Sequence, residues 1–303
     1  MSTVKKYLSL VKFSHTIFAM PFAIIGFFLG VYHIALSKNA GWHTTIMVNN
    51  SIYGTFKLFG LVILCMVFAR SAAMAFNRFL DSNFDAKNPR TAIREIPAGI
   101  ISKESALRFV IINCLLFLAA TYFINRICFL LAPVALFVIL FYSYTKRFTP
   151  LCHLVLGVGL SLAPIGAYLA VTGAFALLPI FFSLAVIFWV SGFDIIYALQ
   201  DIDFDQSQKL YSMPAWLGKA KALRVSQLLH VFSAACVVAA GQYGHFGIWY
   251  WLGVVVFIGM LIYQHSIVKP NDLSKVNIAF MTANGLASIV FSIFVLLDIF
   301  LNH

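Results

Sequence analysis

Long, continuously apolar segments dominate this sequence and restrict the folds open to it. Hydrophobic residues make up 62% of the 303-residue chain, and charged residues only 10%. A water-soluble domain carries about a quarter charged residues, so this chain has too few to cover a soluble globule. The segments are continuously apolar rather than alternating, which argues against a membrane β-barrel. The composition therefore predicts an all-α integral membrane protein and excludes a soluble enzyme or a nucleic-acid-binding module.

Nine segments are long and apolar enough to cross a bilayer, which takes about 20 helical residues. They cover residues 14–36, 57–80, 107–124, 127–145, 151–172, 176–200, 222–240, 247–268 and 279–301. The first is expected to be a retained span rather than a cleaved signal peptide, because no small-residue cleavage site follows it. We expect one polytopic transmembrane domain over residues 1–303.

The positive charges predict how these spans are oriented. If the N-terminus is cytoplasmic, nearly all of the 21 Lys and Arg residues fall on the cytoplasmic side. Only Lys38, Lys57 and Arg126 fall outside, and Arg70 lies within the second span. Cytoplasmic loops of membrane proteins are enriched in Lys and Arg. We therefore expect a cytoplasmic N-terminus and a C-terminus on the outside.

The few acidic residues gather at the cytoplasmic ends of two predicted helices. The chain has only ten Asp and Glu residues, and ionisable groups near membrane depth are usually functional because they are costly there. In the first cluster, Asn77, Asp81 and Asp85 are spaced four residues apart. A helix would place these three side chains within about 80° on one face.

The second acidic cluster contains Asp194, Asp201 and Asp205, which fall within about 40° of one another on a straight helix. Asp203 lies nearly opposite and is excluded from the predicted site. Oxygen ligands without histidine or thiolate favour Mg²⁺, which is commonly completed by phosphates of a substrate. The sequence therefore predicts two facing columns of Mg²⁺ ligands. The alternative is that these acids are solvated charges at helix ends.

Basic residues on the same side of the membrane indicate an anionic ligand. Arg78 directly follows Asn77, Lys146 and Arg147 end the fourth span, and Arg90 and Arg94 follow the first acidic cluster. The alternative for Lys146, Arg147, Arg90 and Arg94 is an anchoring role at the cytoplasmic surface. Carboxylates could gather beside a diphosphate only with metal present. A diphosphate site that opens from the cytoplasm into a central apolar cavity suits a polyprenyl diphosphate, whose ionisation requires charge neutralisation on the leaving group.

These motifs resemble those of the UbiA superfamily of intramembrane aromatic prenyltransferases over essentially the whole chain. The family pattern NxxxDxxxD is matched at 77–85, and DxxYxxxDxxxD is matched by Asp194, Tyr197, Asp201 and Asp205. The segments NRFLDSNFDAKNPRTAIREIPAG and YSYTKRFTPLCHLVLG resemble bacterial 4-hydroxybenzoate polyprenyltransferase-like proteins, including members of the futalosine route to menaquinone. The resemblance implies a nine-helix enzyme of the bacterial inner membrane that prenylates an aromatic acceptor in ubiquinone or menaquinone synthesis.

The resemblance also implies roles for individual residues. The metal ligands, with Asp85 as a further or water-mediated one, would be Asn77, Asp81, Asp85, Asp201 and Asp205. The diphosphate ligands would be Arg78, Lys146 and Arg147. Asp194 is the catalytic candidate that orients or deprotonates the acceptor, and the catalytic candidate Tyr197 lines the same wall of the acceptor pocket.

Three residues outside the motifs carry separate expectations. Arg70 shares a helix face with Asn77 about two turns deeper. It should face a cavity, where we expect it to bind the acceptor's carboxylate; the alternative is a pairing with a helix end. His15 is a candidate for the acceptor pocket, against a hydrogen-bonded core histidine. Asp298 is expected to reach the outer interface.

Several alternatives stay open. Within the family, the acceptor could be a futalosine-derived compound, a naphthoate or haem; prenyl length and oligomeric state are also open. A CDP-alcohol phosphotransferase is disfavoured because its signature needs an Asp-Gly dipeptide, which this sequence lacks. A cation-coupled transporter would place its acids near the bilayer midplane, whereas these lie at helix ends.

Overall fold

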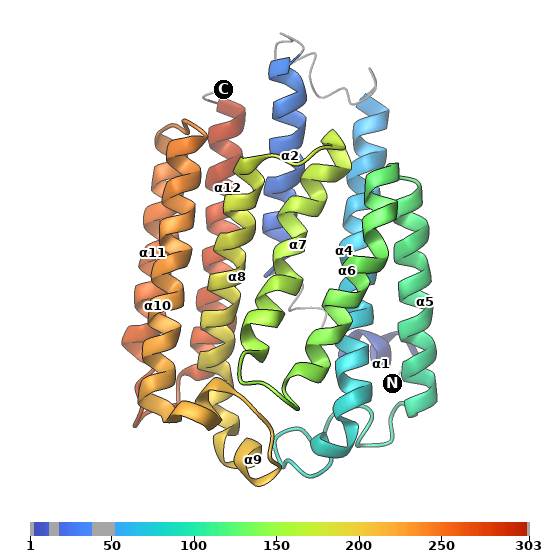
Figure 1. Cartoon of the computed structure of the whole chain (residues 1–303), viewed down its shortest axis with the longest axis vertical. Helices are drawn as coiled ribbons and strands as arrows, with labels where there is room; N and C mark the ends of the chain where they lie inside the picture. The colour runs from blue at the N-terminus through green and yellow to red at the C-terminus, as the bar shows by residue number, and fades with distance from the viewer. Residues whose placement is uncertain (1–2, 12–17, 38–51, 302–303) are drawn as a thin grey trace.

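We describe the protein from a computed structural model that covers residues 3–11, 18–37 and 52–301. The chain forms a bundle of long helices that run side by side between two ends (Figure 1). The helices are α1 (Thr3–Leu10), α2 (Met20–Ser37), α4 (Ile52–Asp85), α5 (Lys103–Tyr122), α6 (Arg126–Thr145), α7 (Cys152–Thr172), α8 (Leu177–Ala198), α9 (Ile202–Ser207), α10 (Met213–Tyr243), α11 (Ile248–Ile267) and α12 (Asn284–Leu301). A short 3-10 helix, Leu199–Asp201, precedes α9, and a π-helical segment, Ile278–Ala283, precedes α12.

The predicted set of nine apolar helices is confirmed. Among the described helices, eight are long and apolar enough to cross a membrane, and Met20–Ala35 of α2 is a ninth, shorter apolar helix. Two helices extend well beyond the predicted spans, because their turns at the charged end of the bundle are polar and hydropathy does not detect them. Helix α4 continues to Asp85, and α10 begins at Met213. Gly218 interrupts α10 with a φ of 75°, a conformation that favours glycine.

Helix α7 packs closely against two neighbours through glycines. A Cβ on Gly26 of α2 would lie 2.0 Å from the carbonyl oxygen of Pro164. A Cβ on Gly157 of α7 would lie 2.5 Å from the carbonyl oxygen of Ile187 in α8. Small residues allow this close approach of helix backbones in a bilayer, where tight packing takes the place of the hydrophobic effect. Helices α2, α7 and α8 therefore form one closely packed layer of the bundle.

Buried polar side chains on the α11–α12 side are paired within the bundle. Trp189 Nε1 donates to Asn284 Oδ1 at 2.9 Å, and Gln264 Nε2 donates to the same oxygen at 2.8 Å. Asp298 is fully buried and accepts hydrogen bonds from the backbone N–H groups of Gly247 and Tyr250 at 2.8 and 3.2 Å. The expectation that Asp298 reaches the interface is wrong, because this carboxylate instead caps the otherwise unpaired N–H groups that begin α11.

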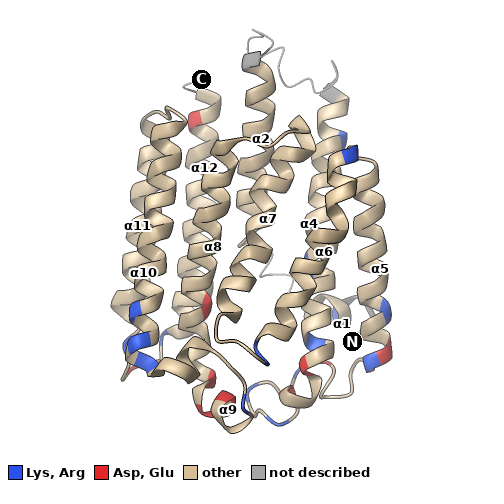
Figure 2. Ribbon diagram, viewed as in Figure 1, with Lys and Arg blue, Asp and Glu red and all other residues tan. Residues whose placement is uncertain are grey.

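Charged residues gather at one end of the bundle (Figure 2). This end carries α1, α9 and the loop between α4 and α5, and α12 finishes at the opposite end (Figure 1). The concentration of Lys and Arg there matches the asymmetry on which the predicted orientation depends. That this end faces the cytoplasm stays a prediction from the sequence.

Candidate active site

The first acidic motif occupies the final turns of α4. This helix has 34 residues, which corresponds to about 50 Å at 1.5 Å per residue and exceeds the thickness of the hydrocarbon core. Its last turns can therefore hold charge. Asn77 Nδ2 donates to Asp81 Oδ2 at 3.0 Å. Asp85 is buried, and its Oδ1 lies 2.7 Å from Nη1 of Arg94.

The second acidic motif does not lie on one straight helix. The predicted 40° arrangement of its three Asp side chains required such a helix and is therefore not retained. Helix α8 ends at Ala198, the 3-10 helix follows, and Asp201 stands at the N-terminus of α9. The 3-10 helix is more tightly wound than the α-helix, so the break changes the direction of the side chains that follow it. Asp205 is nevertheless fully buried. Asp203 is exposed, as expected for a residue outside the site.

Two consecutive basic residues join the two acidic motifs. Lys146 Nζ lies 2.6 Å from Asp205 Oδ1, and Arg147 Nη2 lies 3.3 Å from Asp81 Oδ1. Consecutive Cα atoms are about 3.8 Å apart, so one turn at the end of α6 reaches carboxylates of both motifs. Burial disfavours the charge on Lys146, but the Asp205 carboxylate more than offsets it and raises the pKa of Lys146. The two motif ends therefore converge.

The loop between α4 and α5 closes over the second motif. Arg90 forms an ion pair with Asp201 and donates from Nη1 to the Tyr197 hydroxyl at 3.0 Å. Asn88 Nδ2 also donates to Asp201, at 3.3 Å. Burial lowers the pKa of Arg90, but the neighbouring carboxylate of Asp201 outweighs it and raises that pKa overall. Asp81, Asp85, Asp201 and Asp205 thus each have one basic partner.

The donor atoms here fit a magnesium ion completed by phosphate oxygens. Among the described residues, no three His, Cys, Asp or Glu side chains form a preassembled metal cluster. The oxygens of the two motifs are nevertheless the hard ligands that Mg²⁺ prefers, and Mg²⁺ usually binds through one or two carboxylates with substrate and water. Asp85 Oδ2 is buried and has no hydrogen-bond partner in the described chain. Such an oxygen is suited to a cation.

Asp194 lies deeper on α8 and contacts a residue that the sequence interpretation missed. Its Oδ2 is 2.7 Å from Nδ1 of His153, at the start of α7. The side chain of Asp194 remains 25% exposed, whereas His153 is almost completely buried. His153 stands within the segment YSYTKRFTPLCHLVLG, but no spacing rule connects it to Asp194, which is 41 residues away.

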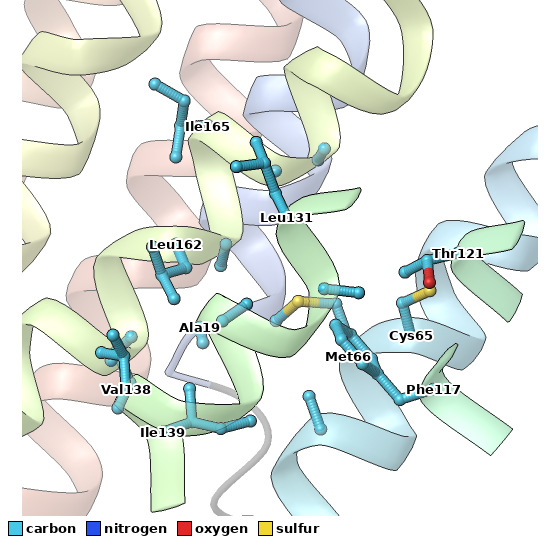
Figure 3. A pocket seen from close by; sticks show the side chains of 18 of the residues that line it. Ala19, Cys65, Met66, Phe117, Thr121, Leu131, Val138, Ile139, Leu162 and Ile165 are labelled. Atoms are coloured by element: carbon cyan, nitrogen blue, oxygen red, sulfur yellow. The ribbon is translucent and has the colours of Figure 1, made fainter. Parts of the chain in front are cut away.

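A cavity of about 400 Å³ lies among α4, α5, α6 and α7 and is lined almost entirely by apolar side chains (Figure 3). Arg70 and Tyr142 are the exceptions at its charged end, and the lining continues to Thr121 and Phe175 near the opposite end of the bundle. Arg70 Nε is buried and has no hydrogen-bond partner among the described residues. Arg70 therefore faces the cavity, as predicted for an arginine inside a span.

Comparison with known proteins places the chain in a family. The model of the UbiA prenyltransferase family matches residues 19–286. This chain belongs to the UbiA prenyltransferase family. A 4-hydroxybenzoate octaprenyltransferase of Aeromonas salmonicida is 29% identical over 73% of this chain and 76% of its own length. One from Aliivibrio fischeri strain ES114 is 30% identical over 76% of this chain and 80% of its own.

Solved structures of UbiA homologues share the fold. A homologue from Aeropyrum pernix K1, solved in the apo state, is 28% identical, with a TM-score of 0.75 over 95% of this chain and 98% of its own. A homologue from Archaeoglobus fulgidus, solved with GPP and Mg²⁺, is 21% identical, with a TM-score of 0.73 over 97% and 99% of the two chains. The chain is therefore an all-helical membrane prenyltransferase with the UbiA fold.

Within this UbiA fold, most predicted site residues meet, and three of the candidates need separate description. Arg78 is buried, lies within electrostatic range of Asp85, Glu95 and Arg94, and has two guanidinium nitrogens without a partner in the described chain. That Arg78 binds the diphosphate stays a prediction from the sequence. His15 lies outside the described residues. The sequence indicates Arg90 only as a further basic candidate, but in the structure Arg90 forms an ion pair with Asp201.

Proposed function

We propose that this UbiA-family prenyltransferase transfers a polyprenyl group from a polyprenyl diphosphate to a small aromatic acid of the 4-hydroxybenzoate type. The proposal depends above all on the convergence of the two acidic motifs on Lys146 and Arg147. The relatives named 4-hydroxybenzoate octaprenyltransferase support the acceptor class. The proposed setting is ubiquinone or menaquinone synthesis at the bacterial inner membrane, with the site open to the cytoplasm.

The charged end of the bundle would bind the diphosphate. Mg²⁺ would be held by Asn77, Asp81, Asp85, Asp201 and Asp205 and would neutralise charge on the leaving diphosphate. Lys146 and Arg147 would bind phosphate oxygens, because both stand among these carboxylates and charge-assisted hydrogen bonds to phosphate are strong. Arg78 is a further diphosphate ligand in this proposal. The ion pairs that Lys146 and Arg147 form with Asp205 and Asp81 support a site in which positive and negative charge are balanced.

The cavity and the deeper polar residues would bind the two reacting groups. The apolar lining suits the polyprenyl tail, which has no polar atoms to satisfy. Arg70 would bind the acceptor's carboxylate at the charged end of the cavity. Tyr142 lies within electrostatic range of Arg70, Asp81 and Asp194, which supports one continuous chamber. The allylic C–O bond would break, a bond to a ring carbon would form, and the ring would lose a proton.

Asp194 would act on the acceptor by orienting its hydroxyl or by accepting a proton, and Tyr197 would line the same wall. The partial exposure of the Asp194 side chain supports contact with a small molecule. A carboxylate can serve as a general base when it lies within hydrogen-bond reach of the proton it removes. Other acceptors proposed within the family are a naphthoate, a futalosine-derived compound and haem.

The test uses membranes that contain the full-length protein. They are incubated with radiolabelled polyprenyl diphosphate and either 4-hydroxybenzoate or one of the other acceptors, with Mg²⁺ or EDTA, and lipid products are identified by mass spectrometry. We expect a prenylated 4-hydroxybenzoate that forms only with Mg²⁺. A product with a different acceptor alone would overturn the acceptor class. Uptake of label without any product would overturn the transfer reaction.

A further inference from the structure

We infer that His153 is a positioning residue that holds the Asp194 carboxylate in the orientation needed at the acceptor. The inference deepens the proposed function and rests on it, because it requires that Asp194 act on the acceptor. His153 does not need to touch either substrate. Its effect would pass through a single hydrogen bond, from its Nδ1 to Asp194 Oδ2, which are 2.7 Å apart.

The protonation of the imidazole follows from its second contact. The backbone N–H of Met213 donates to His153 Nε2 at 3.3 Å. A backbone N–H can only donate, so Nε2 must be the unprotonated nitrogen of the ring. The proton of the neutral imidazole is then on Nδ1, from which it is donated to the Asp194 carboxylate. The Met213 N–H thus selects the tautomer that orients Asp194.

The imidazole is fixed by the packing of α7 against α8. Ser191 Oγ on α8 lies 3.1 Å from the carbonyl oxygen of His153 and 2.6 Å from that of Ile187, and it shares its one hydroxyl proton between them. Gly157, one turn further along α7, lets the two backbones approach so closely that a Cβ there would collide with Ile187. His153 itself is almost completely buried. The ring is therefore held by the main chain as well as by its own two hydrogen bonds.

Only part of the Asp194 carboxylate is used by His153. The hydrogen bond involves Oδ2, and the side chain keeps a quarter of its surface exposed. Asp194 is therefore fixed on one side and accessible on the other. This is the arrangement expected when a second residue sets the direction of a catalytic carboxylate. Loss of the residue that orients a metal ligand commonly lowers activity about 10- to 100-fold, and we expect a loss of the same size here.

A competing role for His153 would be to hold the chain that leads into α10. Met213 is the first residue of α10. The residue before it, Ser212, donates to Asp205 Oδ2 at 2.9 Å, and the N–H of Tyr211 donates to the carbonyl oxygen of Lys146 at 2.7 Å. This segment thus supports the diphosphate end of the site. The two roles use different ring nitrogens, which makes them separable by mutation.

Three substitutions separate these roles. His153→Asn keeps an amide nitrogen near the position of Nδ1, His153→Gln keeps an amide oxygen near the position of Nε2, and His153→Leu keeps neither. We expect His153→Asn to retain a kcat close to that of the unmodified protein. We expect His153→Gln and His153→Leu to lower kcat about 10- to 100-fold, with little change in KM for polyprenyl diphosphate. His230→Leu, which removes another buried imidazole paired with His265, is the control and should retain kcat.

A double-mutant cycle with Asp194→Asn makes the result decisive. If His153 acts through Asp194, His153→Leu should cause no further loss of kcat in the Asp194→Asn background. An undiminished further loss would overturn the inference, as would retention of kcat in His153→Gln with loss in His153→Asn. Equal losses in all three variants and in His230→Leu would also overturn it. These outcomes require an active unmodified protein, so they are distinct from failure of the proposed function, in which the unmodified protein forms no product.

Discussion

Lys146 Nζ lies 2.6 Å from Asp205 Oδ1 and so joins the end of α6 to the second acidic motif. The neighbouring Arg147 contacts Asp81 of the first motif. One helix end thus holds together two carboxylate groups that are more than a hundred residues apart in the sequence. The proposed active site is therefore a single charged unit, assembled where three helices finish at the same end of the bundle.

Removal of Lys146 should weaken both binding and folding. Lys146→Met would remove the ion-pair partner of the fully buried Asp205, and a buried acceptor left without its partner costs about 1–3 kcal/mol. We expect a lower unfolding temperature in detergent and a higher KM for polyprenyl diphosphate. Lys219→Met, which alters an exposed lysine on α10, should change neither quantity. Equal behaviour of the two variants would contradict the role of Lys146.

Loss of one carboxylate from either motif should stop turnover. Asp81→Asn and Asp201→Asn each remove a charge from the proposed Mg²⁺ ligands, and we expect kcat to fall at least about 100-fold, as for other losses of electrostatic stabilisation of a leaving group. Both proteins should still insert in the membrane. Asp203→Asn is the matched control, because Asp203 is exposed beside the same motif. Near-normal turnover in Asp81→Asn or Asp201→Asn would refute the metal assignment.

Arg70 should affect the acceptor and not the prenyl donor. Arg70→Gln removes the cation at the charged end of the cavity, so KM for 4-hydroxybenzoate should rise about 10-fold or more, the loss expected for a hydrogen bond to a charged group. KM for polyprenyl diphosphate should stay unchanged. Steady-state kinetics with each substrate varied in turn checks this. The exposed Arg126 supplies the control variant Arg126→Gln, and an effect of Arg70→Gln on the donor alone would contradict the assignment.

A bulky residue in the apolar cavity should shorten the prenyl chain that the enzyme accepts. Gly159 lines the cavity, and a Cβ there would meet Ile139 only at ordinary contact distances of 3.7 and 3.8 Å. Gly159→Leu should therefore fold and fill part of the 400 Å³ space. We expect lower kcat/KM for long donors and little change for short ones, measured with a series of prenyl diphosphates.

Gly259→Leu tests whether that effect belongs to the cavity. Gly259 lies on α11, where an added Cβ would meet nothing within 4 Å, and it does not line the cavity. Its substitution by Leu should leave the preference for donor length unaltered. If both variants, or neither, changed that preference, the tail would have to bind elsewhere.

The helices and the two motifs could be predicted from sequence because each is a local property. A bilayer forces about 20 apolar residues into each span, and the interval from Asn77 to Asp85 is a helical repeat that needs no tertiary information. The break after Ala198 was not predictable in this way. The break is a 3-10 helix over Leu199–Asp201, and the residue types there are equally compatible with the last turn of an ordinary α-helix.

Pairings between distant residues were the other part that the sequence did not reveal. The partner of Asp194 is His153, on another helix, and no motif connects them. The predicted position of Asp298 at the interface was wrong for the same reason. A carboxylate near a helix end can reach the interface or, as here, cap a neighbouring helix. Which of these occurs is decided by helix packing, and one sequence contains no direct record of that packing.

The proposed function requires both acidic motifs to form one metal–diphosphate site. Electron paramagnetic resonance of Mn²⁺, added in place of Mg²⁺ with a non-reactive polyprenyl diphosphate analogue, measures metal binding without turnover. We predict that the unmodified protein binds Mn²⁺ in a manner that depends on the analogue, and that Asp81→Asn and Asp201→Asn each strongly weaken this binding. Analogue-dependent Mn²⁺ binding that is unchanged in either variant would contradict the claim.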